Sequence, residues 1–247
     1  MSSSAPPAVE FWFEFGSNYS YLTVMRIEDL VRRAGLRLAW KPFLLGPIFR
    51  ELGFEAAPFV QQKEKGEYAW RDVARRAAKY GLAFRHPSEF PRQNVLPLRV
   101  VLAWADAPWI GEFCRRIMLR NWVRDLEIAS EEGVLEALSG LVDDPRAALA
   151  AAVSEANKLA LREQTAEARR RGVFGAPTFS WATRCSGATT AWRTRSGSRW
   201  RSARRIRRYR WPPRSAAGRA RPALRSNRRG CGRWPWRSTA PGRRGRA

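Results

Sequence analysis

The residues best placed to do chemistry lie where a strand pattern gives way to a helix pattern. Residues 9–15 read VEFWFEF, which predicts a buried strand ending in the turn Gly16-Ser17-Asn18. Ser17 falls at or beside the N-cap of the helix that follows. Unpaired backbone N–H groups at a helix start favour an anion, and a serine hydroxyl there can donate one more hydrogen bond. The pattern predicts an anion site at Ser17, with a plain capping serine as the alternative.

The segments on either side indicate how this turn is held. Apolar residues recur at helical spacing over 19–34, Gly35 ends that run, and residues 36–43 form a second short strand pattern. Residues 9–45 therefore predict a strand–helix–strand unit with a right-handed parallel crossover. Lys41 ends the second strand, where it could face an anionic substrate.

A long helical stretch follows this unit. Residues 46–171 contain no strong strand signal and predict a helical domain inserted after the crossover unit. Helices are expected at 67–80, 95–105, 109–121, 130–140 and 145–171. Residues 172–179 then predict a turn followed by another strand, and residues 1–8 a flexible N-terminus.

The positive charge of the chain is concentrated at one end. Residues 180–247 hold 21 of the 46 basic residues, all of them arginine, and none of the 22 acidic residues. Residues 1–179 therefore carry 25 basic and 22 acidic side chains, an ordinary balance for a globular protein. The formal charge of +24 for the whole chain consequently says little about partners.

Residues 180–247 also lack the patterning of a folded segment. Arginine is the only charged type, Trp, Ser, Gly, Ala, Pro and Thr fill most of the rest, and amphipathic periodicity is missing. A G/C-rich gene read out of frame has this composition, and another frame of the permitted codons for residues 180–196 can encode a strand, a turn and a capped helix start. We interpret 180–247 as an out-of-frame, disordered tail. The alternative is an Arg-rich extension whose arginines bind phosphates and whose tryptophans stack on bases.

Cysteine and histidine usage argues against several kinds of site. Cys114, Cys185 and Cys231 have no CxxC or metal-ligand spacing, which favours a reducing compartment over a disulfide scaffold. The single histidine, His86, lies in a polar loop and is interpreted as a surface residue. Residues 1–9 lack signal-peptide regions, and no apolar run approaches the roughly 18–20 residues of a membrane span. We expect a soluble, cytoplasmic protein with no bound metal and no membrane partner.

Five segments occur in an order and spacing that match a known family. They are FEFGSNYSYL at 13–22, KPFLLGPIFRELG at 41–53, KGEYAWRDVARRAAKYGLAF at 65–84, FPRQNVLPLR at 90–99 and GVFGAPTF at 172–179. Together they resemble the glutathione-dependent 2-hydroxychromene-2-carboxylate isomerases of the DsbA-like and kappa-class glutathione transferase group. The resemblance implies an α/β, thioredoxin-like fold with an inserted helical domain. The thioredoxin-like domain would comprise 9–45 and 172–179 and would be incomplete at its C-terminal end.

The family reaction supplies an expected activity and cofactor. The resemblance implies glutathione-dependent cis–trans isomerisation of 2-hydroxychromene-2-carboxylate to trans-o-hydroxybenzylidenepyruvate, in the breakdown of aromatic compounds. Ser17 stands where redox relatives carry a cysteine, and it would activate the glutathione thiolate. Asn18, Glu14 and Phe54 depart from the Pro, Asp and Asn of relatives, which bears on glutathione affinity more than on fold. A homodimer is expected, because relatives are commonly dimers.

The resemblance also implies further site residues. Ala176-Pro177-Thr178 resembles the cis-proline loop that binds the cysteinyl unit of glutathione. Lys65 would contact a glutathione carboxylate, and Asn94 would lie near the active site and its substrate. A solvated lysine and a helix-capping asparagine are the alternatives for Lys65 and Asn94. Competing functions are a kappa-like glutathione transferase, a catalytically dead thioredoxin-fold protein and, less expected, an Arg-rich nucleic-acid-binding protein.

Overall fold

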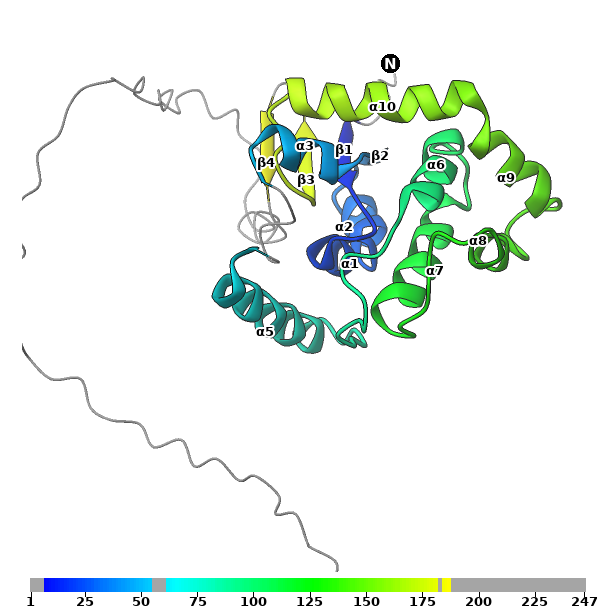
Figure 1. The fold of residues 1–247 in the computed structure, drawn as a ribbon. Helices are drawn as coiled ribbons and strands as arrows, with labels where there is room; N and C mark the ends of the chain where they lie inside the picture. The colour runs from blue at the N-terminus through cyan, green and yellow to red at the C-terminus, as the bar shows by residue number, and fades with distance from the viewer. Residues whose placement is uncertain (1–6, 55–60, 182–183, 188–247) are drawn as a thin grey trace, which may run out of the picture. The chain divides into compact units, whose positions relative to one another are not determined.

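The structure is a computed structural model that describes residues 7–54, 61–181 and 184–187 (Figure 1). The predictions of a flexible segment at the N-terminus and a disordered tail concern, for the most part, residues 1–6 and 188–247, which lie outside the described residues. The described helices and strands belong to one compact unit.

A mixed β-sheet joins the beginning of the described chain to its end. The strand order is β2-β1-β3-β4, in which β1 and β2 are parallel and the other neighbours are antiparallel. The parallel pair requires a crossover, as the strand–helix–strand pattern predicts. The strands are β1 (Ala8–Phe13), β2 (Arg37–Pro42), β3 (Thr178–Trp181) and β4 (Arg184–Gly187).

The sheet begins earlier in the chain and ends later than the sequence predicted. We predicted that the thioredoxin-like domain ends at Phe179, but β3 continues to Trp181 and β4 pairs with it. The prediction failed because β4 is short and unpatterned, and it adds to β3 through backbone groups that any sequence carries. The predicted flexible segment 1–8 is also too long. Ala8 begins β1, and the Arg37 N–H donates to the Pro7 carbonyl at 3.0 Å.

The crossover between β1 and β2 consists of two helices where the sequence predicted one. They are α1 (Asn18–Val24) and α2 (Ile27–Arg33). Arg26 separates them with a φ of −137°, outside the helical region. The apolar periodicity continues across this break, so the spacing of residues alone does not reveal it.

The predicted helical stretch is present between β2 and β3. Its predicted final helix, 145–171, is divided at Ser154, whose hydroxyl accepts a hydrogen bond from the Asn157 N–H at 3.3 Å. In Figure 1, α10 passes across α3 and the end of the sheet, with which it is in contact. The helices are α3 (Leu45–Glu51), α5 (Lys63–Lys79), α6 (Val95–Ala103), α7 (Ile110–Trp122), α8 (Glu131–Leu138), α9 (Pro145–Val153) and α10 (Glu155–Arg170).

Strand β1 supplies side chains to two apolar cores, because successive side chains of a strand point to opposite faces. Phe11 and Phe13 are buried in the larger core, which includes residues of α1, α6 and α7. Trp12 lies in a smaller core with Ile48 of α3 and Ala168 of α10. Both faces of β1 are therefore covered, and the turn at its carboxyl end is fixed from two sides. Within the described residues, no helix is long and apolar enough to span a membrane.

Candidate active site

Ser17 lies in the turn between β1 and α1 and caps that helix. Its backbone is extended, with φ −89° and ψ 120°, and its Oγ accepts a hydrogen bond from the Ser20 N–H at 3.2 Å. The Ser17 N–H in turn donates to the carbonyl oxygen of Glu14 at 3.3 Å. The hydroxyl therefore has a fixed place at the start of α1, as an N-cap serine requires.

A cis-proline loop meets Ser17 from the other end of the chain. The Ala176–Pro177 peptide bond is cis, and the Ser17 Oγ donates a 2.8 Å hydrogen bond to the Ala176 carbonyl oxygen. Thr178 Oγ1 donates to the Gly175 carbonyl at 2.8 Å, which closes the loop on itself. The structure thus joins two predicted site residues, Ser17 and Ala176, by a direct contact across 159 positions of sequence.

The backbone of Ala176 retains binding capacity. Ala176 is only half-buried, and its N–H has no hydrogen-bond partner among the residues that the structure describes. Its carbonyl oxygen accepts the Ser17 hydroxyl and can accept a second donor. An N–H and a C=O on one accessible backbone position are the groups that pair with an extended peptide.

The carboxyl group of Glu14 is buried next to the turn. The Asn94 Nδ2 donates to Glu14 Oε1 at 2.7 Å, and the Leu45 N–H donates to Glu14 Oε2 at 3.2 Å. Burial of the carboxyl raises the pKa of Glu14 to about 7, and these two hydrogen bonds oppose that rise. A Cβ at Gly16 would lie 2.7 Å from Asn94 Nδ2 and 3.0 Å from Glu14 Oε1. The close approach explains why glycine occupies this position.

Asn94 therefore contacts the turn and does not cap its helix by a side-chain bond. It occupies the N-cap position of α6, yet its side chain makes no capping hydrogen bond and is only 6% exposed. Its amide is instead bound to Glu14, three residues before Ser17. The alternative that the Asn94 side chain caps the helix is accordingly wrong, although the residue occupies the N-cap position.

The two predicted lysines lie on α5 and β2. Lys65 is exposed in the first turns of α5. Lys41 is paired with Trp12 in the parallel ladder, and ladder partners share a face, so it lies on the sheet face that carries the smaller core. Helix α1 packs on the other face, with Phe11. Across the described part of the chain, neither lysine side chain forms a hydrogen bond or an ion pair.

Sequence reasoning missed two residues that hold the turn. The Asn121 Nδ2 and the Trp122 Nε1 both donate to the Phe15 carbonyl oxygen, at 3.2 Å and 3.1 Å. Both lie at the end of α7 and are buried. More than a hundred residues separate them from Phe15, and no local pattern marks such a contact.

The described residues offer little for metal binding or for catalysis by cysteine or histidine. The described residues contain no cluster of His, Cys, Asp and Glu side chains placed to hold a metal ion. Cys114 is fully buried in the core, and burial raises the pKa of its thiol well above the usual value. His86 is exposed and packs on Trp70, with ring centroids 4.2 Å apart.

The family model of the DSBA-like thioredoxin domain matches residues 8–193. The chain belongs to the DsbA-like thioredoxin family. The predicted thioredoxin-like fold and the DsbA-like resemblance are confirmed. The match continues beyond Phe179, in agreement with the presence of β4.

Solved structures show the same fold. A 2-hydroxychromene-2-carboxylate isomerase is similar with a TM-score of 0.66 and 22% identity, over 73% of this chain and 88% of that chain. The cytosolic disulfide reductase DsbM from Pseudomonas aeruginosa is similar with a TM-score of 0.54 and 17% identity, over 72% of this chain and 87% of that chain. A structure of DsbM with GSH gives a TM-score of 0.53 and 18% identity, over 72% and 88%. No curated protein sequence matches this DsbA-like chain.

Proposed function

We propose that this DsbA-like protein is a glutathione-dependent isomerase that converts 2-hydroxychromene-2-carboxylate into trans-o-hydroxybenzylidenepyruvate. The observation that carries the proposal is the 2.8 Å hydrogen bond from the Ser17 hydroxyl to the Ala176 carbonyl, next to the cis peptide bond of Pro177. It brings a donor for a thiolate to a backbone that can bind a peptide. The fold shared with an isomerase of that reaction supports the choice of substrate.

The residue types at the start of α1 favour a reaction that uses the thiol of a bound cofactor over one that uses a cysteine of the protein. Thiol–disulfide exchange needs a cysteine thiolate as nucleophile, and a pair of cysteines separated by two residues is its usual form. Here the corresponding segment is Ser17-Asn18-Tyr19-Ser20, with serine at both ends. A chain with no thiol at this position can still bind and polarise the thiol of a cofactor.

The groups around Ala176 fit a peptide cofactor such as glutathione. The N–H of Ala176, which donates to no described residue, would donate to the carbonyl of the cysteinyl unit, and the Ala176 carbonyl would accept the N–H of that unit. Pro177 and Thr178 hold the loop in the required shape, and a fold relative has been solved with GSH. We assign Lys65 on the exposed surface of α5 to a glutathione carboxylate.

Ser17 would act by donating a hydrogen bond to the sulfur. Bound glutathione would supply a thiolate that adds to the conjugated carbon and leaves again, so that the double bond becomes single, rotates and re-forms. In the structure the hydroxyl hydrogen of Ser17 is directed to the Ala176 carbonyl, so it must turn from that oxygen to the sulfur. A hydrogen bond to a charged group is worth about 1.5–3 kcal/mol, which lowers the pKa of a thiol by about one to two units and so raises the share of thiolate at neutral pH.

An assay with a mass balance for glutathione tests the proposal. The purified protein should convert 2-hydroxychromene-2-carboxylate only when glutathione is added, and total free glutathione should be unchanged after many turnovers. Consumption of glutathione would indicate the kappa-like transferase instead. Failure both to convert the substrate and to bind glutathione would contradict the proposal and favour a catalytically dead thioredoxin-fold protein.

A further inference from the structure

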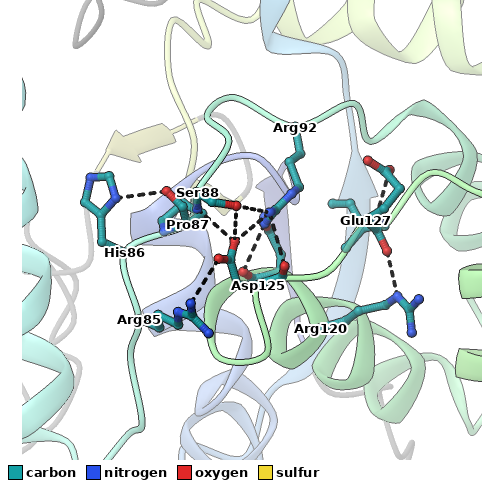
Figure 2. Close-up of polar contacts among 10 residues, drawn as sticks. Arg85, His86, Pro87, Ser88, Arg92, Arg120, Asp125 and Glu127 are labelled. Atoms are coloured by element: carbon teal, nitrogen blue, oxygen red, sulfur yellow. Dashed lines mark hydrogen bonds and ion pairs between the residues drawn. The ribbon is translucent and has the colours of Figure 1, made fainter.

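Arg92 forms a buried network of hydrogen bonds in the loop before α6 (Figure 2). Its side chain is 4% exposed. One terminal nitrogen, Nη1, donates to the side-chain oxygen of Asn121 at 3.1 Å and to the Asn121 carbonyl at 3.5 Å. The other, Nη2, donates to Asp125 Oδ1 at 2.5 Å, to the Asp125 carbonyl at 3.3 Å and to Ser88 Oγ at 3.2 Å. The planar guanidinium therefore fixes two segments of chain relative to each other.

Asp125 is held in place by more than Arg92. Its side chain is 7% exposed, and it accepts from both the N–H and the hydroxyl of Ser88, at 2.8 Å and 3.0 Å. Arg85 lies at 3.5 Å from its second oxygen. The hydrogen bond from Arg92 is the main cause of a pKa lowered to about 2, so the carboxylate is charged at neutral pH. Arg92 and Asp125 therefore form an ion pair at neutral pH.

Asn121 connects this network to the turn that carries Ser17. Because the Asn121 Oδ1 accepts from Arg92, the amide is oriented with its Nδ2 toward the Phe15 carbonyl, to which it donates at 3.2 Å. Phe15 is fully buried and lies two residues before Ser17. A change at Arg92 would release this orientation, since nothing else is bound to that oxygen in the described part of the chain.

Asn94 makes a second connection from the same loop. It follows Arg92 by two residues and donates to Glu14 at 2.7 Å. The turn is thus held at Glu14 by the loop before α6 and at Phe15 by the end of α7. Arg92 belongs to the loop before α6, and its side chain connects that loop to Asn121 at the end of α7.

We propose that Arg92 is a positioning residue that, through Asn121 and the loop carrying Asn94, holds the Glu14–Ser17 turn against Ala176. The consequence for isomerase turnover rests on the proposed function. The positioning itself does not, and it can be measured without glutathione or substrate.

A cysteine at position 17 reports on the position of the turn. We would introduce Ser17→Cys into the full chain and measure the rate of alkylation of residue 17 by iodoacetamide as a function of pH. Mass spectrometry of the peptide containing residue 17 separates this thiol from the other cysteines. The pH profile gives the pKa of the thiol, which depends on the hydrogen bonds and the charge around it.

Two variants in this background test the network, and one serves as a matched control. Arg92→Lys keeps the charge but cannot make the forked contacts. Asn121→Asp keeps an acceptor for Arg92 but removes the donor to the Phe15 carbonyl. Arg120→Lys is the control, because Arg120 also joins α7 to the following loop, through the Glu127 carbonyl at 2.6 Å (Figure 2). Arg120 bonds nothing in residues 14–17.

We expect Arg92→Lys and Asn121→Asp to change the alkylation rate at fixed pH by a factor of about three to ten, the worth of one or two hydrogen bonds. Arg120→Lys should leave the rate unchanged. The proposal is overturned if both test variants, shown to be folded by circular dichroism, match the Ser17→Cys parent, or if Arg120→Lys has as large an effect. Should Arg92→Lys fail to fold, Asn121→Asp decides alone. Absence of glutathione binding would count only against the proposed function.

Discussion

At the scale of single residues, the Ser17 hydroxyl takes part in two hydrogen bonds with different consequences. As an acceptor from the Ser20 N–H it caps α1, and as a donor it reaches the Ala176 carbonyl. The first contributes to stability and the second places the hydroxyl at the proposed cofactor site. One substitution removes both, so a control is needed that removes only a cap.

Ser130 provides that control, because its Oγ accepts from the Gly133 N–H at 3.1 Å at the start of α8. Ser17→Ala and Ser130→Ala should each lower the free energy of unfolding by about 1 kcal/mol, measured by urea denaturation. Only Ser17→Ala should lower kcat/KM for isomerisation, by a factor of about 10–100, because it removes a donor to a charged sulfur. Equal activity in the two variants would contradict the role given to Ser17.

Glu14 makes a testable contribution to the pH dependence of stability. Its pKa in the folded protein is raised to about 7 from the ordinary 4.5, so the folded state binds more protons than the unfolded state between these values. Stability therefore falls as pH rises from 4.5 through 7, by about 3 kcal/mol at most for a shift of this size. Glu14→Gln should lack this part of the fall. Parallel stability profiles of wild type and variant would show that Glu14 titrates normally.

At the scale of elements, the turn between β1 and α1 is constrained by close packing beneath Gly16. A Cβ there would lie 2.7 Å from Asn94 Nδ2, closer than van der Waals contact, whereas a Cβ at Gly46 in α3 would meet nothing within 4 Å. Gly16→Ala should destabilise the protein by about 1–3 kcal/mol, as overpacking does, and should lower isomerase activity by displacing Ser17.

Gly46→Ala is the matched substitution, and it should leave stability unchanged or raise it slightly, because alanine favours helix. Thermal unfolding of both variants, followed by circular dichroism, makes the comparison. A Gly16→Ala variant as stable and as active as Gly46→Ala would mean that the turn adapts freely and that its packing does not position the site.

The turn is the element that the sequence predicts best. A strand of alternating aromatics followed by Gly16-Ser17-Asn18 indicates both the strand end and the capping serine, because these signals are local. The breaks at Arg26 and Ser154 could not be predicted, since the apolar spacing runs across them. The donors Asn121 and Trp122 could not be predicted either, because their partner Phe15 is distant in sequence.

At the scale of the whole molecule, the order of elements predicts a parallel crossover unit followed by a helical stretch. The family resemblance adds the thioredoxin-like fold, which the family match confirms. The C-terminal end of the thioredoxin-like domain could not be predicted from the sequence. The change to Arg-rich composition after Phe179 suggested a boundary there, but β4 pairs with β3 in residues 184–187. Strand pairing uses backbone groups, so a segment of unpatterned composition can still complete a sheet.

The uneven distribution of basic residues leads to a prediction about polyanions. A chain that ends at Gly187 keeps every described strand and loses most of the arginines of 180–247. We expect it to retain glutathione binding and to lose any salt-dependent binding of single-stranded DNA that the full chain has, because such binding follows the number of cations. Retention of DNA binding by the shorter chain, measured by fluorescence anisotropy across a salt series, would locate it in the thioredoxin-like domain.

The most direct measurement is the ultraviolet absorbance of the thiolate of bound glutathione as a function of pH, for wild type and Ser17→Ala. The absorbance of the protein alone is subtracted, which removes the contribution of its own three cysteines. We predict a thiol pKa below the ordinary value of about 8.5 in the wild-type complex and a return toward it in Ser17→Ala. Glutathione that binds with the same thiol pKa in both proteins, or does not bind at all, would contradict this account.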